Sequence, residues 1–121
     1  MFQMKNEQQT EIRRNVRGGN GALPFCHVFS AQQLAGRASM LARVALAPGE
    51  SIGEHPHTEN AEAYYVLSGE LAVTEDGICR ILHAGDAELC ADGHVHAIEN
   101  RSAQPAEFLA LILPNREGGT I

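Results

Sequence analysis

Glycine recurs at a fixed interval through the middle of the chain. Gly69, Gly77, Gly85 and Gly93 are eight residues apart, and Gly53 lies sixteen residues before the first of them. The segments between these glycines, such as AYYVLS, ELAVTE and ICRILH, are rich in Val, Ile, Leu or Tyr and are too short for a good helix. Short strands separated by tight turns are typical of an all-β domain, either a sandwich or a barrel.

The remaining patterns divide the chain into a polar N-terminal segment and one strand-rich domain. Residues 1–21 are polar and end in GGNG, so we expect an arm that is either mobile or docked on another surface. Residues 22–121 then form a single domain, in which Ser30 caps one helical turn over 30–36. We expect an edge strand at 22–30 and core strands at 38–47, 52–57, 62–68, 70–76, 78–83, 86–91, 95–101 and 106–113.

Two local patterns refine this layout. The dipeptide Asp76-Gly77 favours a hairpin with a primed turn, because both residues tolerate positive φ angles. The last strand contains FLALIL, which is apolar on both faces. We therefore expect it to be buried on both sides, inside a closed barrel or at a subunit interface.

Length, charge and cysteine usage limit the classes of protein. A chain of 121 residues has room for one domain with one core. Its net charge of −6 disfavours a nucleic acid partner. No apolar run reaches the ~20 residues that span a bilayer, and the N-terminus lacks an apolar signal core, so no membrane partner is expected. Three cysteines without a CxxC pair indicate a reducing compartment, and we expect a cytoplasmic protein.

Three histidines and one glutamate are spaced so that they can meet around one ion. His55 and His57 are two residues apart, so both side chains project from the same face of a strand. Glu62 follows after a short loop, and His96 begins a later strand. This nitrogen and oxygen ligand set suits manganese, iron, nickel or zinc, and four protein ligands leave two positions of an octahedron open for water or a substrate.

Two further residues are candidates for contact with a substrate. Tyr64 shares the face of Glu62, and it is either a hydrogen-bond donor to a substrate or a core aromatic residue. Arg43 lies on an earlier strand and clamps a carboxylate only if its side chain points inward. The alternate residues of that strand are more apolar and compete for the interior, which favours a solvent-facing arginine.

The combined spacing resembles the two motifs of the cupin superfamily. The first motif, G-x5-H-x-H-x3or4-E-x6-G, is matched by Gly49, His55, His57, Glu62 and Gly69. The second, G-x5-P-x-G-x2-H-x3-N, is matched by Gly85, Gly93, His96 and Asn100, with Ala91 in place of the usual proline. The resemblance implies a double-stranded β-helix, which is a small jelly-roll barrel. It also implies that His55, His57, Glu62 and His96 bind one divalent transition metal ion per chain, with manganese as first choice and iron, nickel or zinc after it.

The resemblance also limits the function. Small single-domain cupins with the run ExYYVLSG look most like proteins loosely described as oxalate-decarboxylase-like, which implies a metal-dependent dioxygenase or decarboxylase that acts on a small carboxylic or enolic acid. Oxalate decarboxylases of this superfamily carry two cupin domains, and they place an arginine three residues before the first ligand histidine, where this chain has Ile52. The alternative is a non-enzymatic module that binds or senses a small acid through the metal.

Two further expectations concern the remaining histidines and the assembly of the chain. His27, His83 and His94 are expected to stay outside the metal site. Small single-domain cupins usually pair, so the resemblance implies a homodimer. The segment ALPFCHVFS at 22–30 is the part of the chain expected to add to the sheet edge of the partner.

Overall fold

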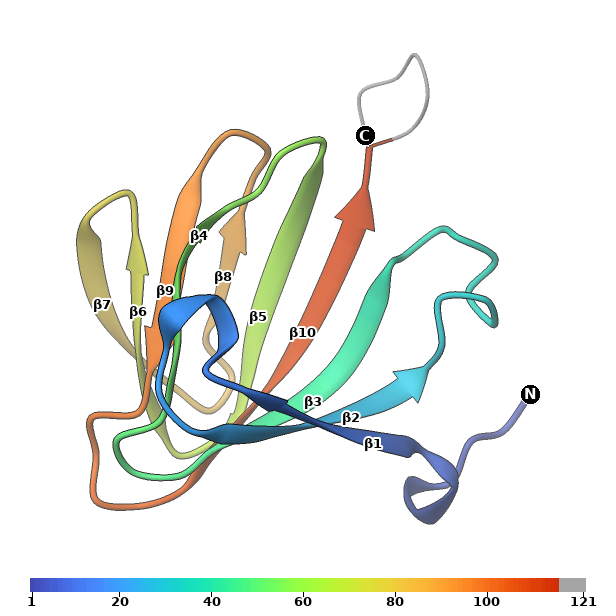
Figure 1. Cartoon of the computed structure of the whole chain (residues 1–121), viewed down its shortest axis with the longest axis horizontal. Helices are drawn as coiled ribbons and strands as arrows, with labels where there is room; N and C mark the ends of the chain where they lie inside the picture. Colours follow the sequence, from blue (N-terminus) through green and yellow to red (C-terminus); the bar gives the residue numbers. More distant parts are fainter. Residues whose placement is uncertain (116–121) are drawn as a thin grey trace.

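Two antiparallel sheets make up the fold in the computed structural model, which describes residues 1–115 (Figure 1). The larger sheet has the strand order β1-β2-β3-β10-β5-β8, and the smaller has the order β4-β9-β6-β7. The strands are β1 (Gln9–Arg14), β2 (Ala22–Phe29), β3 (Met40–Leu46), β4 (Ser51–Pro56), β5 (Asn60–Ser68), β6 (Glu70–Glu75), β7 (Ile78–His83), β8 (Ala87–Cys90), β9 (Val95–Glu99) and β10 (Ala106–Pro114). Strands distant in sequence pair with one another, which confirms the predicted all-β jelly-roll barrel.

The local predictions agree closely with the structure. Each core strand expected between residues 38 and 113 is present, and its ends differ from the expected ones by at most two residues. Asp76 and Gly77 have φ angles of 49° and 82°, as a primed turn requires. The backbone N–H of Gln33 donates a hydrogen bond to Ser30 Oγ at 3.0 Å, so Ser30 caps the single turn that follows β2.

Part of the N-terminal segment is a strand of the larger sheet, whereas the sequence predicted an arm over residues 1–21 that is either mobile or docked on another surface. β1 pairs with β2 in a register that runs from Gln9 opposite His27 to Arg14 opposite Ala22. β2 therefore has a neighbour on each side, and β1 is the edge strand instead. Because its backbone is already paired with β1 and β3, β2 cannot add to the sheet edge of a partner, and the predicted route to a homodimer is wrong.

The polar composition of β1 explains why the sequence did not reveal it. Five of its six side chains are exposed and one is half-buried, so the strand has no alternation of apolar and polar residues. Its position depends on backbone pairing with β2. Two short 3-10 helices flank it, η1 (Lys5–Glu7) and η2 (Val16–Gly18). No helix within residues 1–115 has the length and apolar character that a membrane crossing requires.

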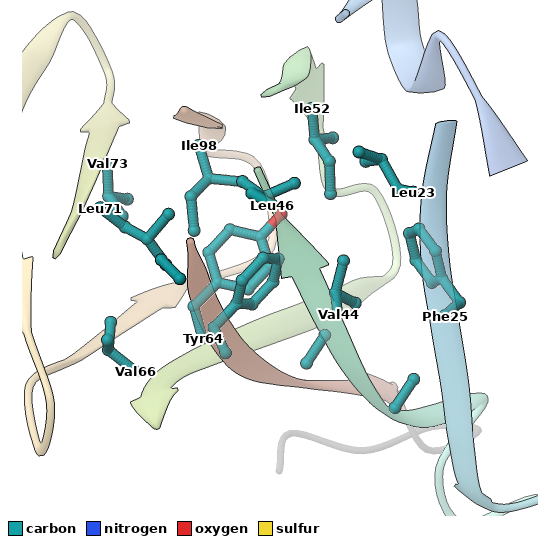
Figure 2. Close-up of a cluster of buried hydrophobic side chains, with 14 residues drawn as sticks. Leu23, Phe25, Val44, Leu46, Ile52, Tyr64, Val66, Leu71, Val73 and Ile98 are labelled. Atoms are coloured by element: carbon teal, nitrogen blue, oxygen red, sulfur yellow. The ribbon is translucent and has the colours of Figure 1, made fainter. Parts of the chain in front are cut away.

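The hydrophobic core lies between the inner faces of the two sheets (Figure 2). The Tyr64 ring lies in the middle of the cluster in Figure 2, and the side chains of Val44, Leu46 and Ile98 lie around it. All four residues are at most 1% exposed. Burial of each large apolar side chain contributes roughly 1.5–3 kcal/mol to stability. The core therefore holds the strands that carry the predicted ligands in place.

β10 does not have two buried faces inside the barrel, as one alternative for FLALIL required. Phe108 and Ala110 are buried in the core, whereas Leu109 and Leu111 are half-buried on the outer face of the larger sheet. Leu111 pairs there with Leu41 of β3 and with Ala63 of β5. Leu111, Leu41 and Ala63 therefore form a small apolar patch on the outer face of this sheet.

Asn100, the last residue of the second motif, has a structural role. Its side chain is fully buried, and its Nδ2 donates hydrogen bonds to the carbonyl oxygens of Leu46 at 2.9 Å and Gln104 at 2.8 Å. Its Oδ1 accepts hydrogen bonds from the backbone N–H of Ser102 at 2.9 Å and from Ser102 Oγ at 2.8 Å. Asn100 thus ties the loop after β9 to the end of β3.

Candidate metal centre

The first two predicted ligands come from the end of β4, which contains a β-bulge. Ile52 pairs with Ile98 and His55 pairs with His96, so β4 has one residue more than β9 between these two pairs. Residues three apart in a regular strand face opposite sides, and the additional residue lets both Ile52 and His55 face the interior. His57 follows two residues later, and its side chain is also buried.

The other two predicted ligands come from strands in different sheets. Glu62 lies on β5 in the larger sheet, and His96 lies on β9 in the smaller one. The period of two holds on both strands, because Tyr64 is buried with Glu62 and Ile98 is buried with His96. The site therefore lies between the two sheets.

The four side chains meet at one point. Glu62 Oε1 lies 3.0 Å from His57 Nε2, 3.0 Å from His96 Nε2 and 3.5 Å from His55 Nε2. His57 Nε2 and His96 Nε2 are 3.1 Å apart. All four candidate ligand atoms lie within 4.8 Å of one another, and all four residues are buried.

The outer nitrogen of each imidazole has a hydrogen-bond acceptor. The Nδ1 atoms of His55, His57 and His96 lie 2.8 Å from the Gly53 carbonyl oxygen, 2.8 Å from Asn60 Oδ1 and 2.9 Å from Glu88 Oε1, respectively. An N–H at each Nδ1 leaves the lone pair on Nε2, and the three lone pairs then point at one another and at a carboxylate oxygen. Such an arrangement is favourable only around a cation, and outer hydrogen bonds of this kind are typical of metal-bound histidines. The residues present thus fit a divalent transition metal ion.

The charges of the cluster agree with a cation at its centre. Burial opposes the charged form of His96, but hydrogen bonds with Glu62 and Glu88 outweigh it and raise the pKa of His96 to about 9. Burial likewise opposes the charged form of Glu62, but hydrogen bonds with His55 and His96, and then the charges of His96 and His57, lower the pKa of Glu62 to about 2. Without an ion, His96 therefore holds a proton at neutral pH, and a metal ion replaces that proton.

A small cavity of about 120 Å³ opens beside the cluster. Its lining residues are Arg13, Val16, Arg17, Phe25, Met40, Ile52, His55, His57, Glu62, Tyr64 and Ile112. Sites for drug-sized ligands measure ~300–1,000 Å³, so this one admits only a small molecule. Hollows of about 470 and 500 Å³ lie elsewhere, and neither is lined by any of the four candidate ligands.

Tyr64 is both a core residue and a wall of this cavity. Its ring stacks on His96 with centroids 4.5 Å apart and meets Phe108 edge to face at 4.8 Å. Burial, and then the charges of Glu62 and Glu88, hold the pKa of Tyr64 well above its usual value. The hydroxyl group therefore stays protonated at neutral pH and can act as a hydrogen-bond donor.

Arg43 does not reach the site, so its predicted role as a carboxylate clamp is corrected. The buried residues of β3 are Ala42, Val44 and Leu46, and Arg43 alternates with them to face outward. On the outer side its guanidinium group donates hydrogen bonds to Gln8 Oε1 at 3.1 Å and Cys26 Sγ at 3.0 Å, and it pairs with Glu107. The more apolar side chains of β3 are the buried ones, as the alternation of the sequence indicated.

The other histidines lie outside the cluster, as predicted. His27, His83 and His94 pair with the carboxylates of Glu11, Glu70 and Asp76, respectively. Glu88 and Cys90 approach His96 from its outer side and form a second group with it. Burial, and then the charges of nearby carboxylates, raise the pKa of Cys90 to about 12, so its thiol stays protonated and is a poor metal ligand.

Sequence reasoning missed four residues that contribute to the site. Asn60 and Glu88 hold two of the imidazoles, and Arg13 and Arg17 line the cavity. Glu88 had no clear signal, because in the short strand AELC the apolar Leu89, which would be expected to face the interior, is the exposed residue. The two arginines had none, because they reach the cavity only through the pairing of β1 with β2.

Comparisons with known proteins agree with this site. The family model described as "Cupin domain" matches residues 42–112. The oxalate-binding protein of Thermotoga maritima is 37% identical over 113 residues, which cover 93% of this chain and 93% of that protein. The tetracenomycin polyketide synthase protein TcmJ of Streptomyces glaucescens is 36% identical over 74 residues, or 61% of this chain and 50% of that protein.

Solved structures show the same fold. A crystal structure of a predicted oxalate decarboxylase from Thermotoga maritima superposes with a TM-score of 0.90 and 35% identity over 94% of this chain and 99% of the other. KdgF from a Halomonas species superposes with a TM-score of 0.74 and 20% identity over 98% of this chain and 96% of the other, and it supports the fold alone. With the matched family model and the relative from Thermotoga, these findings show that the chain belongs to the cupin family.

Proposed function

We propose that the chain binds one divalent transition metal ion through His55, His57, Glu62 and His96, and that a small carboxylic or enolic acid binds at the positions these ligands leave open. The observation that carries this proposal is the convergence of four buried ligand atoms beside a cavity of about 120 Å³. Manganese is the first choice of metal, followed by iron, nickel or zinc. The name of the Thermotoga relative, oxalate-binding protein, supports an acid as the ligand.

A bound ion would act as a Lewis acid that orients and polarises a carboxylate or enolate oxygen. The chain supplies the rest of the site. The acceptors at each Nδ1 hold the imidazoles in place, and the apolar walls formed by Phe25, Ile52 and Ile112 limit the access of water. Tyr64 is the one protein group in the described lining, apart from the candidate ligands and two arginines, that can donate a proton or a hydrogen bond to a ligand.

Dioxygenase or decarboxylase chemistry is the reaction that we propose for such a site. Tyr64, which stays protonated at neutral pH, is proposed as a donor to the bound acid and not as a base. The second candidate is a module that binds or senses the acid without turning it over. It is favoured by the described lining of the cavity, in which the only carboxylate is Glu62, itself a candidate ligand.

Metal analysis followed by a substrate screen tests the proposal. Protein purified without added metal or a histidine tag is analysed for metals, then reconstituted with each candidate ion and screened with small acids with and without air. His96→Ala should lose the metal and any turnover, whereas His94→Ala changes an exposed imidazole two residues away and should keep both. Less than about half an equivalent of transition metal in every preparation contradicts the proposal.

Turnover separates the two candidate functions. A catalyst consumes the acid and loses that activity in His96→Ala. A binding module leaves the acid unchanged and shows only a rise in melting temperature when acid and metal are both present, because a ligand that binds the folded state stabilises it.

A homodimer and a cytoplasmic location are also proposed. The leucine patch on the outer face of the larger sheet, formed by Leu41, Leu109 and Leu111, is the surface that we assign to the dimer, because β2 is already paired on both sides. Light scattering during size-exclusion chromatography should give twice 13.0 kDa, and Leu111→Glu should give a monomer. A monomeric wild-type protein refutes the dimer.

The cytoplasmic location is supported by the cysteine usage, because Cys26, Cys79 and Cys90 are all free thiols.

A further inference from the structure

One wall of the cavity beside the metal centre comes from the N-terminal segment. β1 ends at Arg14, and the chain then turns through η2 to lie against β4 before it enters β2 (Figure 1). Arg13, Val16 and Arg17 of this segment line the cavity together with the candidate ligands His55, His57 and Glu62. Two cationic side chains thus lie at a site that is otherwise lined by apolar groups, the candidate ligands and Tyr64.

Arg13 is held at the cavity by its neighbours. It pairs across the sheet with Leu23, which is fully buried, so its side chain starts from the inner face. The guanidinium carbon lies 4.6 Å from the centre of the Phe25 ring. Nε donates a hydrogen bond to Glu11 Oε1 at 3.0 Å, and Nη2 forms an ion pair with the same oxygen at 2.9 Å, whereas Nη1 has no acceptor within residues 1–115. That amino group is available to a ligand.

Arg17 reaches the cavity because the backbone turns sharply. Its φ and ψ angles are 55° and 34°, in the left-handed region that costs free energy for any residue except glycine. Hydrogen bonds from the N–H groups of Gly18 to the Asn15 carbonyl, at 3.1 Å, and of Gly19 to the Val16 carbonyl, at 2.9 Å, hold this turn. Among the described residues, none pairs with the Arg17 guanidinium group.

Two glycines allow the turn to lie directly on β4. A Cβ atom on Gly53 would lie 2.0 Å from the carbonyl oxygen of Arg17, and one on Gly19 would lie 2.3 Å from that of Ser51. The backbone N–H of Asn20 also donates a hydrogen bond to Ser51 Oγ at 3.0 Å. The segment that carries Arg17 is therefore fixed to the strand that carries His55, and both the strained backbone and the close contact serve to place this arginine.

We propose that Arg13 and Arg17 bind the second anionic group of a dianionic acid whose first carboxylate lies on the metal ion. The inference rests on the proposed function and narrows its ligand to acids with two negative charges. The charges of the groups that line the cavity support this proposal. A divalent ion and the Glu62 carboxylate would leave one net positive charge there, Arg17 adds another, and the charge of Arg13 is balanced by Glu11. Ile52 lines the same cavity but carries no charge, so it cannot form an ion pair with a carboxylate. Within the described lining, the two arginines are the groups that can.

Calorimetric titration of the metal-loaded protein with malonate and acetate tests the inference. Malonate carries two carboxylates and acetate one, so only malonate can reach both the ion and the arginines. Arg17→Gln should weaken malonate binding by about 10- to 100-fold, the range expected for a lost charged hydrogen bond, and should change acetate binding by less than about threefold. Arg13→Gln should act in the same direction. Arg14→Gln is the matched control, because Arg14 is exposed and does not line the cavity.

The outcomes separate this inference from the proposed function. Metal content and melting temperature are measured for each variant, and Arg17→Gln changes an exposed side chain that the fold does not require. Equal malonate affinity in wild type and both variants overturns the inference, as does an equal loss of affinity for malonate and acetate. A wild-type protein that holds the metal but binds neither acid overturns the proposed function as well.

Discussion

Metal binding should release one proton at neutral pH, because the ion displaces the proton that His96 holds between Glu62 and Glu88. The pKa of His96 is raised to about 9 in the metal-free protein. At pH 7 the proton therefore opposes metal binding by about 2.7 kcal/mol, at ~1.36 kcal/mol for each pH unit. The apparent dissociation constant of the metal should fall about tenfold for each unit between about pH 7 and pH 8.5.

Calorimetry in two buffers with different ionisation enthalpies measures the proton directly. Titration with manganese under nitrogen should show about one proton released per ion at pH 7 and progressively less as the pH approaches about 9. Glu88→Gln removes one of the two carboxylates that hold the proton, so the dependence on pH should become shallower. Glu70→Gln is the control, because Glu70 pairs with the exposed His83 and should leave the dependence unchanged. No proton release at pH 7, or a dissociation constant that is flat from pH 7 to 8.5, would refute the reasoning.

Three further perturbations test other parts of the structure. The pKa of His96 is higher in the folded than in the unfolded protein, so its contribution to stability is complete below about pH 6.5 and is lost as the pH rises through about 9. Thermal unfolding of the metal-free protein should show this decline, and a flat profile would contradict it. Asn100→Ala should lower the free energy of unfolding in urea by about 2–4 kcal/mol, because it leaves buried partners without hydrogen bonds. Asn115→Ala, at an exposed position, should change it by less than about 0.5 kcal/mol, and equal effects would argue against the buried network. Gly53→Ala places a Cβ against the carbonyl of Arg17, so it should weaken malonate binding more than metal binding, and a calorimetric titration that shows no difference speaks against the close contact.

The four candidate ligands could be predicted from the sequence because each depends on a short-range pattern. His55 and His57 follow the period of two, Glu62 shares a strand face with Tyr64, and His96 lies near the start of a strand that follows the turn at Gly93. The outward orientation of Arg43 could also be predicted from the sequence, because the residues that alternate with it are more apolar. Local periodicity was enough wherever one face of a strand had to be buried.

The N-terminal wall of the cavity could not be predicted in this way. β1 has no apolar alternation, and its register is set by pairing with β2. The bulge in β4 could not be predicted from the sequence either, because it is defined by the pairing of β4 with β9. Arg13 and Arg17 depend on these long-range contacts, so the second half of the site emerges only from the folded chain.

The stacking of Tyr64 on His96 gives this protein an optical reporter of its own. The chain contains no Trp and two Tyr, so its ultraviolet emission comes from Tyr64 and the exposed Tyr65. A paramagnetic ion bound to the imidazole beneath Tyr64 would quench the emission of that ring far more than the emission of Tyr65, which is exposed. With Tyr65→Phe the chain keeps a single tyrosine, whose ring centre lies 4.5 Å from that of the candidate ligand His96, so metal loading could be followed without any added dye.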